Sequence, residues 1–121
     1  MNRLVALSLV LLVSAVRADV SLPAVFSDGM VLQQTQLVPV WGQAAPGEAV
    51  KVTFGDQTQS TTAAKDGKWR VTLSPLNASD KPAELVVAGK NTLTVKNVLV
   101  GEVWVCSGQS NMAMTVNRTL N

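Results

Sequence analysis

Apolar and polar side chains alternate along much of the chain between residues 48 and 96. In residues 50–54, two valines and a phenylalanine alternate with Lys51 and Thr53, and the same period of two returns in residues 69–73. A period of two is typical of a strand that has one face on a hydrophobic core and the other in water. This part of the chain therefore predicts several half-buried β-strands.

Turn signals separate the predicted strands at intervals of about ten residues. Glycine beside aspartate is a strong signal of this kind, and it occurs at Asp28-Gly29, Gly55-Asp56 and Asp66-Gly67. We expect one hairpin around Asp66-Gly67, with a polar, threonine-rich strand in residues 57–64 before it. A second hairpin is expected around residues 89–91, which read Gly-Lys-Asn.

Prolines refine this arrangement. Pro39 interrupts an apolar stretch at residues 37–41, and because proline cannot donate a hydrogen bond to a sheet, we expect it at a sheet edge or at the start of a strand. Residues 74–82 contain two more prolines and are expected to form a loop. No helical stripe occurs in residues 19–97. Short strands with turns between them predict an antiparallel β-sandwich, either immunoglobulin-like or jelly-roll-like.

The pattern changes after Val98. Residues 98–106 form an almost unbroken apolar run, and a short polar turn follows it. Such a run is typical of a strand that is buried on both faces, as in the parallel sheet of an α/β domain, and we place this strand at residues 102–106.

A helix is expected to follow the polar turn. Apolar residues recur at every fourth position from Met112 to Leu120, and Asn111 is a good N-cap residue. We therefore assign residues 19–98 to the β-sandwich and residues 99–121 to the first strand and helix start of an incomplete α/β domain.

The first 18 residues have the pattern of a secretory signal peptide. Arg3 supplies a positive charge, residues 4–16 are apolar, and small residues precede a cleavage site ahead of Asp19. The apolar stretch is shorter than the roughly 20 residues that span a bilayer. We expect a secreted or periplasmic protein that has no membrane attachment once the signal is cleaved; without cleavage, residues 4–16 would remain as an anchor.

The net charge of the chain changes when the predicted signal peptide is excluded. The chain has ten Lys and Arg against eight Asp and Glu, but Arg3 and Arg17 lie in the predicted signal peptide, so the mature chain is formally neutral. Its basic residues are scattered, which gives no indication of a nucleic-acid partner. No cluster of His, Cys or carboxylate residues has metal-ligand spacing, and neither a metal nor another cofactor is implied. The oligomeric state is not indicated.

The polar turn contains a candidate nucleophile, Ser110, which follows Gly108 and Gln109 and precedes Asn111. Open α/β sheets place reactive groups at the carboxyl end of a strand, where the N–H groups of a following helix can stabilise negative charge. The turn departs from the Gly-x-Ser-x-Gly pattern of a nucleophile elbow because Met112 replaces the second glycine.

A structural role for the turn is the alternative. Ser107 and Ser110 can satisfy backbone groups and cap the helix. Gln109 and Asn111 can orient a substrate or cap the helix, and capping is the role expected of Asn111. The chain also has no histidine, which is the usual general base for a serine nucleophile.

The cysteine and the tryptophans are assigned to core packing. Cys106 is the chain's single cysteine, so it has no partner for an intramolecular disulfide, and its place in the apolar run favours burial. Trp41, Trp69 and Trp104 lie in alternating or apolar strands, which favours core packing over sugar binding.

Three longer motifs carry a resemblance to a known family. They are residues 22–33 (LPAVFSDGMVLQ), residues 38–42 (VPVWG) and residues 101–112 (GEVWVCSGQSNM). Together they closely resemble the sialate O-acetylesterase family, and the similarity extends over nearly all of the expected mature chain.

The resemblance implies a secreted carbohydrate esterase with an amino-terminal β-sandwich and an SGNH-type hydrolase domain. It implies that Ser110 is the nucleophile and that its backbone N–H contributes to the oxyanion hole, together with a glycine and an asparagine from later blocks. The family's Asp-x-x-His block has no counterpart here. We therefore predict that this chain is inert by itself, while a full-length parent releases acetate from an O-acetylated carbohydrate, either a sialic acid or a plant polysaccharide.

A rival interpretation remains open. The chain can instead be a non-catalytic secreted β-sandwich that binds carbohydrate or supports a neighbouring domain. Asn77 and Asn117 begin glycosylation sequons, and these are left unassigned because they matter only in a eukaryotic secretory route.

Overall fold

The fold is described by a computed structural model in which residues 19–109 are placed, and these residues form a mainly β structure with no helix. The strands are β1 (Val31–Gln33), β2 (Val38–Gln43), β3 (Ala49–Phe54), β4 (Gln57–Thr62), β5 (Lys68–Leu73), β6 (Ser79–Ala88) and β7 (Thr92–Gly101). The predicted mainly β fold is thereby confirmed.

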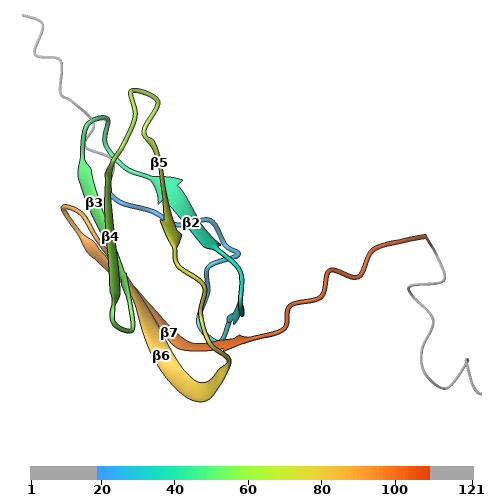
Figure 1. Cartoon of the computed structure of the whole chain (residues 1–121). Coiled ribbons are helices and arrows are strands. Elements are labelled where there is room, and N and C mark those ends of the chain that lie inside the picture. The colour runs from blue at the N-terminus through green and yellow to red at the C-terminus, as the bar shows by residue number, and fades with distance from the viewer. Residues whose placement is uncertain (1–18, 110–121) are drawn as a thin grey trace, which may run out of the picture.

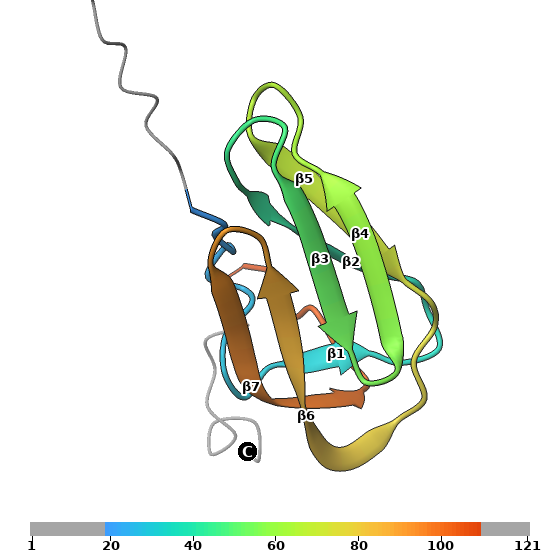
Figure 2. The same ribbon diagram turned by 90° about the vertical axis from the view of Figure 1, so that its left-hand side faces the viewer.

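The strands form two sheets. Five of them lie in the order β1-β7-β6-β3-β4, and β2 pairs with β5 in a separate two-stranded sheet. Figures 1 and 2 show the small sheet lying across one face of the large one. All pairs are antiparallel except β1 and β7, which run parallel, so the large sheet is mixed where we expected only antiparallel pairing. The parallel pair arises because the chain leaves β1 for the small sheet, and β1 pairs with the last strand instead of with the next one.

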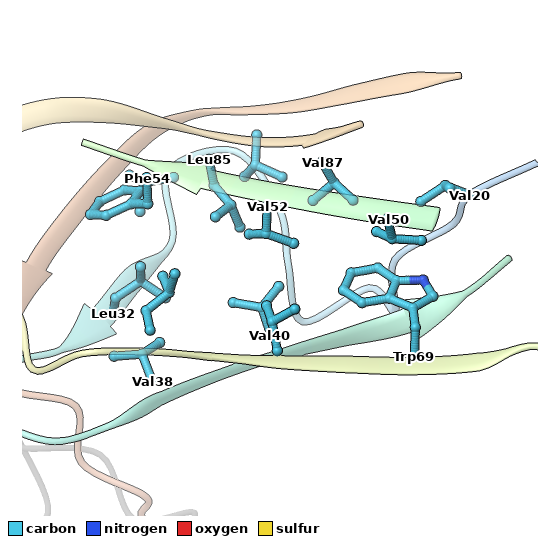
Figure 3. Packing of buried hydrophobic residues seen from close by; sticks show 14 of the residues in the cluster. Val20, Leu32, Val38, Val40, Val50, Val52, Phe54, Trp69, Leu85 and Val87 are labelled. Carbon is cyan, nitrogen blue, oxygen red and sulfur yellow. The ribbon is translucent and has the colours of Figure 1, made fainter. Parts of the chain in front are cut away.

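The hydrophobic core lies between the two sheets. Figure 3 shows Val40 and Trp69 of the small sheet facing Val50, Val52 and Val87 of the large sheet. The predicted alternation of residues 50–54 is confirmed, because the apolar side chains at positions 50, 52 and 54 are all buried. Alternating strands of both sheets thus supply one continuous core.

The expected hairpin around residues 89–91 is confirmed, since β6 and β7 pair on either side of it. The turn at Asp66-Gly67 also forms, with Gly67 at a φ of 81° and its N–H 2.9 Å from the carbonyl oxygen of Ala64. This turn, however, passes from β4 in the large sheet to β5 in the small one. The prediction of a hairpin there was wrong, because the turn residues fix a local reversal but not the sheet that the next strand joins.

Two predictions about the prolines had different outcomes. Pro39 lies in β2, which has a single ladder partner, β5, so the predicted edge position is confirmed. The expected loop at residues 74–82 is shorter, because β6 already begins at Ser79. Register shifts occur between Ser79 and Ala83 and again between Ala83 and Leu85, so Pro82 lies in an irregular part of the strand where it interrupts no regular ladder.

Close packing of two backbones requires a glycine at position 42. A Cβ atom at Gly42 would lie 2.1 Å from the carbonyl oxygen of Ser21 and 2.8 Å from the Cζ2 atom of Trp69. Ser21 forms an isolated antiparallel bridge with Gln43, next to this position. Gly42 therefore lets the amino-terminal segment lie against β2 directly above the buried indole of Trp69.

The apolar run after Val98 differs most from expectation. β7 continues through Gly101, but residues 102–109 contain no strand, whereas we predicted a buried strand at residues 102–106. The expected burial of Cys106 was also wrong, since this residue is exposed. The physical reason is that burial of both faces needs a layer on each side, and no described residues cover this segment.

Only one tryptophan lies in the core as predicted. Trp69 is 4% exposed, whereas Trp41 is 41% and Trp104 is 82% exposed. Trp41 alternates with two buried residues of β2 and therefore points away from the core. The helix expected from Asn111 lies outside the described residues, and within residues 19–109 there is no helix of the length and hydropathy needed to cross a membrane.

Candidate functional site

The segment that leads to the candidate nucleophile leaves the large sheet at the end of β7. Figure 1 shows residues 102–109 running away from both sheets. Gly108 and Gln109 are exposed in this segment. Ser110 and Asn111 lie outside the described residues, so the structure gives the approach to the predicted site and does not test the roles assigned to them.

Backbone pairing with β1 fixes where this segment begins. The register of the parallel pair places Val31 opposite Leu99 and Gln33 opposite Gly101. Beyond the ladder, the Gln34 N–H donates to the carbonyl oxygen of Gly101 at 2.9 Å. The motif at residues 22–33 therefore lies directly beside the start of the motif at residues 101–112.

Two glutamine side chains extend this contact past the end of the sheet. Gln34 Nε2 lies 2.5 Å from Glu102 Oε1, and Gln33 Nε2 lies 3.2 Å from Glu102 Oε2. The Val103 N–H in turn donates to Gln33 Oε1 at 2.8 Å. We call these three side chains, Gln33, Gln34 and Glu102, the exit clamp, because they hold the first two residues of the outgoing segment against β1.

The hydrogen bonds of the exit clamp favour the charged form of Glu102. Hydrogen bonds from the side-chain amides of Gln34, which has the larger effect, and of Gln33 hold the pKa of Glu102 below its ordinary value. An ionised carboxylate accepts both amide donors, so the clamp is complete when Glu102 is charged. Glu102 is exposed and the two glutamines are half-buried, so the clamp lies at the surface, where its role is to position the segment.

A turn at the other end of β1 adds a further anchor. Asp28 Oδ1 accepts a hydrogen bond from the Lys96 N–H at 2.7 Å, and the Gly29 N–H donates to the Lys96 carbonyl oxygen at 2.9 Å. The predicted turn at Asp28-Gly29 thus fixes β1 to β7 before their ladder begins.

Sequence reasoning missed the exit clamp. It found residues 22–33 and 101–112 as separate motifs, and nothing in their spacing showed that they meet. The sequence signal that could have indicated this contact was the pair Gln33-Gln34 at the end of the first motif, together with Glu102 near the start of the other. Amide and carboxylate side chains at the ends of two strands pair only when those strands are neighbours, which the sequence pattern did not reveal.

The described arrangement positions the segment that leads toward Ser110, but it does not complete an acyl-transfer site. The chain contains no histidine to serve as general base. Within residues 19–109, no three His, Cys, Asp or Glu side chains lie together in a way that could hold a metal ion.

Comparison with known proteins identifies relatives of this chain. It is 39% identical over 103 residues to the sialate O-acetylesterase of Mus musculus and 37% identical over 106 residues to that of Homo sapiens. These matches cover 76% and 78% of the chain, but only 19% and 20% of the two relatives. The chain therefore spans about a fifth of the length of the curated proteins that it matches.

A solved structure agrees with these relatives. The crystal structure of a carbohydrate acetylesterase from Xanthomonas citri matches with a TM-score of 0.74 and 40% sequence identity, over 77% of this chain and 21% of that one. No family model matches the chain.

Proposed function

The matched part of the chain belongs to the sialate O-acetylesterase family, and from this we propose that the chain is part of a secreted carbohydrate O-acetylesterase. The proposed reaction is release of acetate from an O-acetylated sugar. One observation supports it most directly: the parallel pairing of β1 with β7 joins two family-like motifs, and the exit clamp holds the segment that continues to Ser110.

In the proposed mechanism, Ser110 is the nucleophile of an acyl transfer. Its Oγ, deprotonated by a histidine of a longer parent protein, attacks the acetyl carbonyl carbon, and the alcohol of the sugar leaves with a proton. Water then hydrolyses the acetyl-enzyme and releases acetate. The backbone N–H of Ser110 donates to the oxyanion, and removal of one such donor typically costs about 3 kcal/mol of transition-state stabilisation.

The proposed organisation follows the sequence. Residues 1–18 serve as a cleaved signal peptide, residues 19–98 as a β-sandwich of immunoglobulin-like or jelly-roll-like type, and residues 99–121 as the start of an SGNH-type hydrolase domain. Under this proposal, Gly108, Gln109 and Asn111 shape the turn around Ser110. The exit clamp sets the direction in which the chain enters the hydrolase domain.

The chain by itself is proposed to be inactive, because it has no histidine. The test compares acetate release from an acetylated xylan and from O-acetylated sialic acid by this chain and by a longer polypeptide that contains it. We expect no release by the chain alone. We expect release by a longer polypeptide that supplies an Asp-x-x-His block, and its loss on Ser110→Ala substitution in that polypeptide.

A folded Ser110→Ala variant that still releases acetate would overturn the assignment of the nucleophile. Acetate release by the chain alone would overturn the proposal of inactivity. Ser107→Ala in the same longer polypeptide is the matched control, because it removes a hydroxyl from the same turn without removing the proposed nucleophile.

A second candidate function is a non-catalytic module that binds carbohydrate or supports a neighbouring domain. It is favoured by one observation, the exposed indole of Trp41 on the outer face of the small sheet. This role is compatible with an esterase parent.

A further inference from the structure

The outer face of the small sheet carries a groove that the proposed esterase mechanism does not use. The groove has a volume of about 740 Å³ and is lined by residues of β2 and β5, by residues 21–23 of the amino-terminal segment that bridges to Gln43, and by Thr62 at the end of β4. β2 and β5 form a two-stranded sheet of their own, which Figure 1 shows apart from the five-stranded sheet.

An exposed aromatic ring forms one wall of the groove. Trp41 is 41% exposed, although its neighbours Val40 and Gly42 are buried. Its ring meets that of Phe26 edge-on, with a centroid distance of 4.9 Å and an interplanar angle of 76°. Phe26 packs in turn against the hydrophobic core, so the indole is held in place by a second ring that is itself anchored.

Polar side chains that suit a sugar lie directly opposite. The register of the antiparallel pair places Trp41 across from Arg70 and Gln43 across from Lys68. Paired residues point to the same face of a sheet, so one aromatic ring, one amide and two cations share the surface. A pyranose ring can pack its C–H face on an indole, while amide and guanidinium groups donate hydrogen bonds to its oxygens.

The positive charge of the groove favours a sugar that carries a negative charge. Lys68 and Arg70 both line the groove, and none of its lining residues is acidic. Within residues 19–109, Arg70 has no ion-pair partner, and Lys68 has only a 3.8 Å contact with Asp66, in which both side chains are more than half exposed. An exposed pair of this kind contributes little, so both cations are available to an anionic ligand. A guanidinium can bind a carboxylate through two parallel hydrogen bonds.

We propose that this groove is a binding site for a carbohydrate that carries a carboxylate, with the sugar ring on Trp41 and the carboxylate at Arg70. Lys68 adds a second positive charge, and Gln43 binds a hydroxyl group. The site lies in residues that are present in this chain and needs no catalytic group. It rests on the second candidate function, a carbohydrate-binding module, and does not depend on the proposed esterase activity.

The test follows the indole N–H signals of the 15N-labelled chain by NMR during titration with trigalacturonic acid. The chain has three tryptophans and hence three such signals, which single Trp→Phe variants assign. We expect a saturable shift of the Trp41 signal and little change in that of Trp104. The trimethyl ester of the same sugar keeps the rings and removes the charges, so we expect it to produce a much smaller shift.

Variants separate the contributions of the ring and the charge. Trp41→Ala removes that indole signal, so in this variant the backbone amide signals of Gln43 and Arg70 report binding, and they should show no saturable shift. Trp104→Ala, which removes another exposed indole, should leave the response of Trp41 and of these amides unchanged. Arg70→Gln should weaken binding of the acid by about tenfold, the usual effect of removing a charge-assisted hydrogen bond. Lys51→Gln removes a cation from an exposed position on β3 and should have no comparable effect.

Several results would overturn the proposal. An equal response to the acid and its ester would contradict recognition of the carboxylate. A response that survives in folded Trp41→Ala and Arg70→Gln variants would place the sugar elsewhere. A Trp41 signal that shifts with protein concentration, without sugar, and does not respond to the acid would assign the face to a second copy of the chain.

Discussion

Glu48 is a buried carboxylate that joins two turns far apart in the sequence. One oxygen accepts the Lys90 N–H at 2.6 Å, at the turn between β6 and β7, and the other accepts the Ala45 N–H at 3.0 Å, across the Pro46-Gly47 turn. The hydrogen bond from Lys90 is the main cause that holds the pKa of Glu48 below its ordinary value of 4.5, against the opposing effect of burial. The charged form is therefore the one that stabilises the fold.

Glu48→Gln is expected to lower the unfolding temperature at neutral pH. A glutamine keeps one acceptor oxygen, but its NH2 group would face one of two N–H donors that now meet carboxylate oxygens. Because the folded pKa is depressed, the stabilisation by Glu48 is present above pH 4.5 and is lost as the pH falls through the folded value. The difference between wild type and variant should thus shrink in acid, as measured by thermal unfolding followed by circular dichroism.

Glu84→Gln is the matched control, because Glu84 lies exposed on β6. It should change the unfolding temperature little at any pH. A Glu48→Gln variant with the wild-type unfolding temperature at neutral pH would show that the carboxylate does not hold these two turns together.

At the scale of elements, the exit clamp links β1 to the segment after β7. The backbone ladder ends at Gln33 and Gly101, and beyond it the hydrogen bonds pass through side chains. Glu102 orients the amide of Gln33, whose oxygen accepts the Val103 N–H. The clamp therefore makes the backbone position of Val103 depend on the charge of Glu102.

Glu102→Ala is expected to speed exchange of the Val103 amide hydrogen with solvent. Because these hydrogen bonds are exposed, their loss is expected to raise the exchange rate of Val103 by only a few-fold. In the wild type, exchange corrected for its intrinsic pH dependence should rise as the pH falls through the depressed pKa of Glu102. Solvent-exchange NMR measures both effects.

Glu84→Ala should leave exchange at Val103 unchanged, because it removes a carboxylate from a different part of the surface. Equal exchange in wild type and Glu102→Ala would mean that the clamp does not restrain the segment.

The same elements show how far the sequence predicted the fold. Alternation in residues 50–54 correctly predicted which side chains enter the core, because a period of two has only one consistent set of inward positions. The turn at Asp66-Gly67 was also predicted, but the partners of β4 and β5 were not. Turn chemistry acts over a few residues, whereas the choice of sheet depends on packing against distant strands.

The candidate site was less predictable than the strands. Apolar character at residues 102–106 predicted burial, but burial depends on what covers a segment, and residues 19–109 contain no such cover. For Trp41, alternation with buried neighbours would have indicated an outward position, yet aromatic character favoured the core. The role of Ser110 rests on its place in the polar turn and on the family resemblance, since it lies outside the described residues.

At the scale of the whole molecule, the described core is complete before the segment that leads to Ser110. The last residue of the buried cluster is Val100, and no residue from 101 to 109 belongs to it. Val103, Trp104 and Val105 are instead all exposed. The two sheets are therefore expected to fold without the part of the chain that would carry the chemistry.

A chain that ends at Val103 should be as stable as one that continues to Asn121, when both begin at Asp19. The shorter chain keeps every buried residue of the described core and the exit clamp, so its free energy of unfolding should differ by no more than about 0.5 kcal/mol. Urea unfolding followed by circular dichroism makes the comparison independent of the fluorescence of Trp104, which the truncation removes. Leu85→Ala serves as the reference for a defect in the core, because it removes a fully buried side chain and should lower the free energy of unfolding by about 2 to 5 kcal/mol. A loss of that size on truncation would instead mean that residues beyond Val103 complete the core. The two sheets would then need the segment that leads to Ser110 in order to be stable.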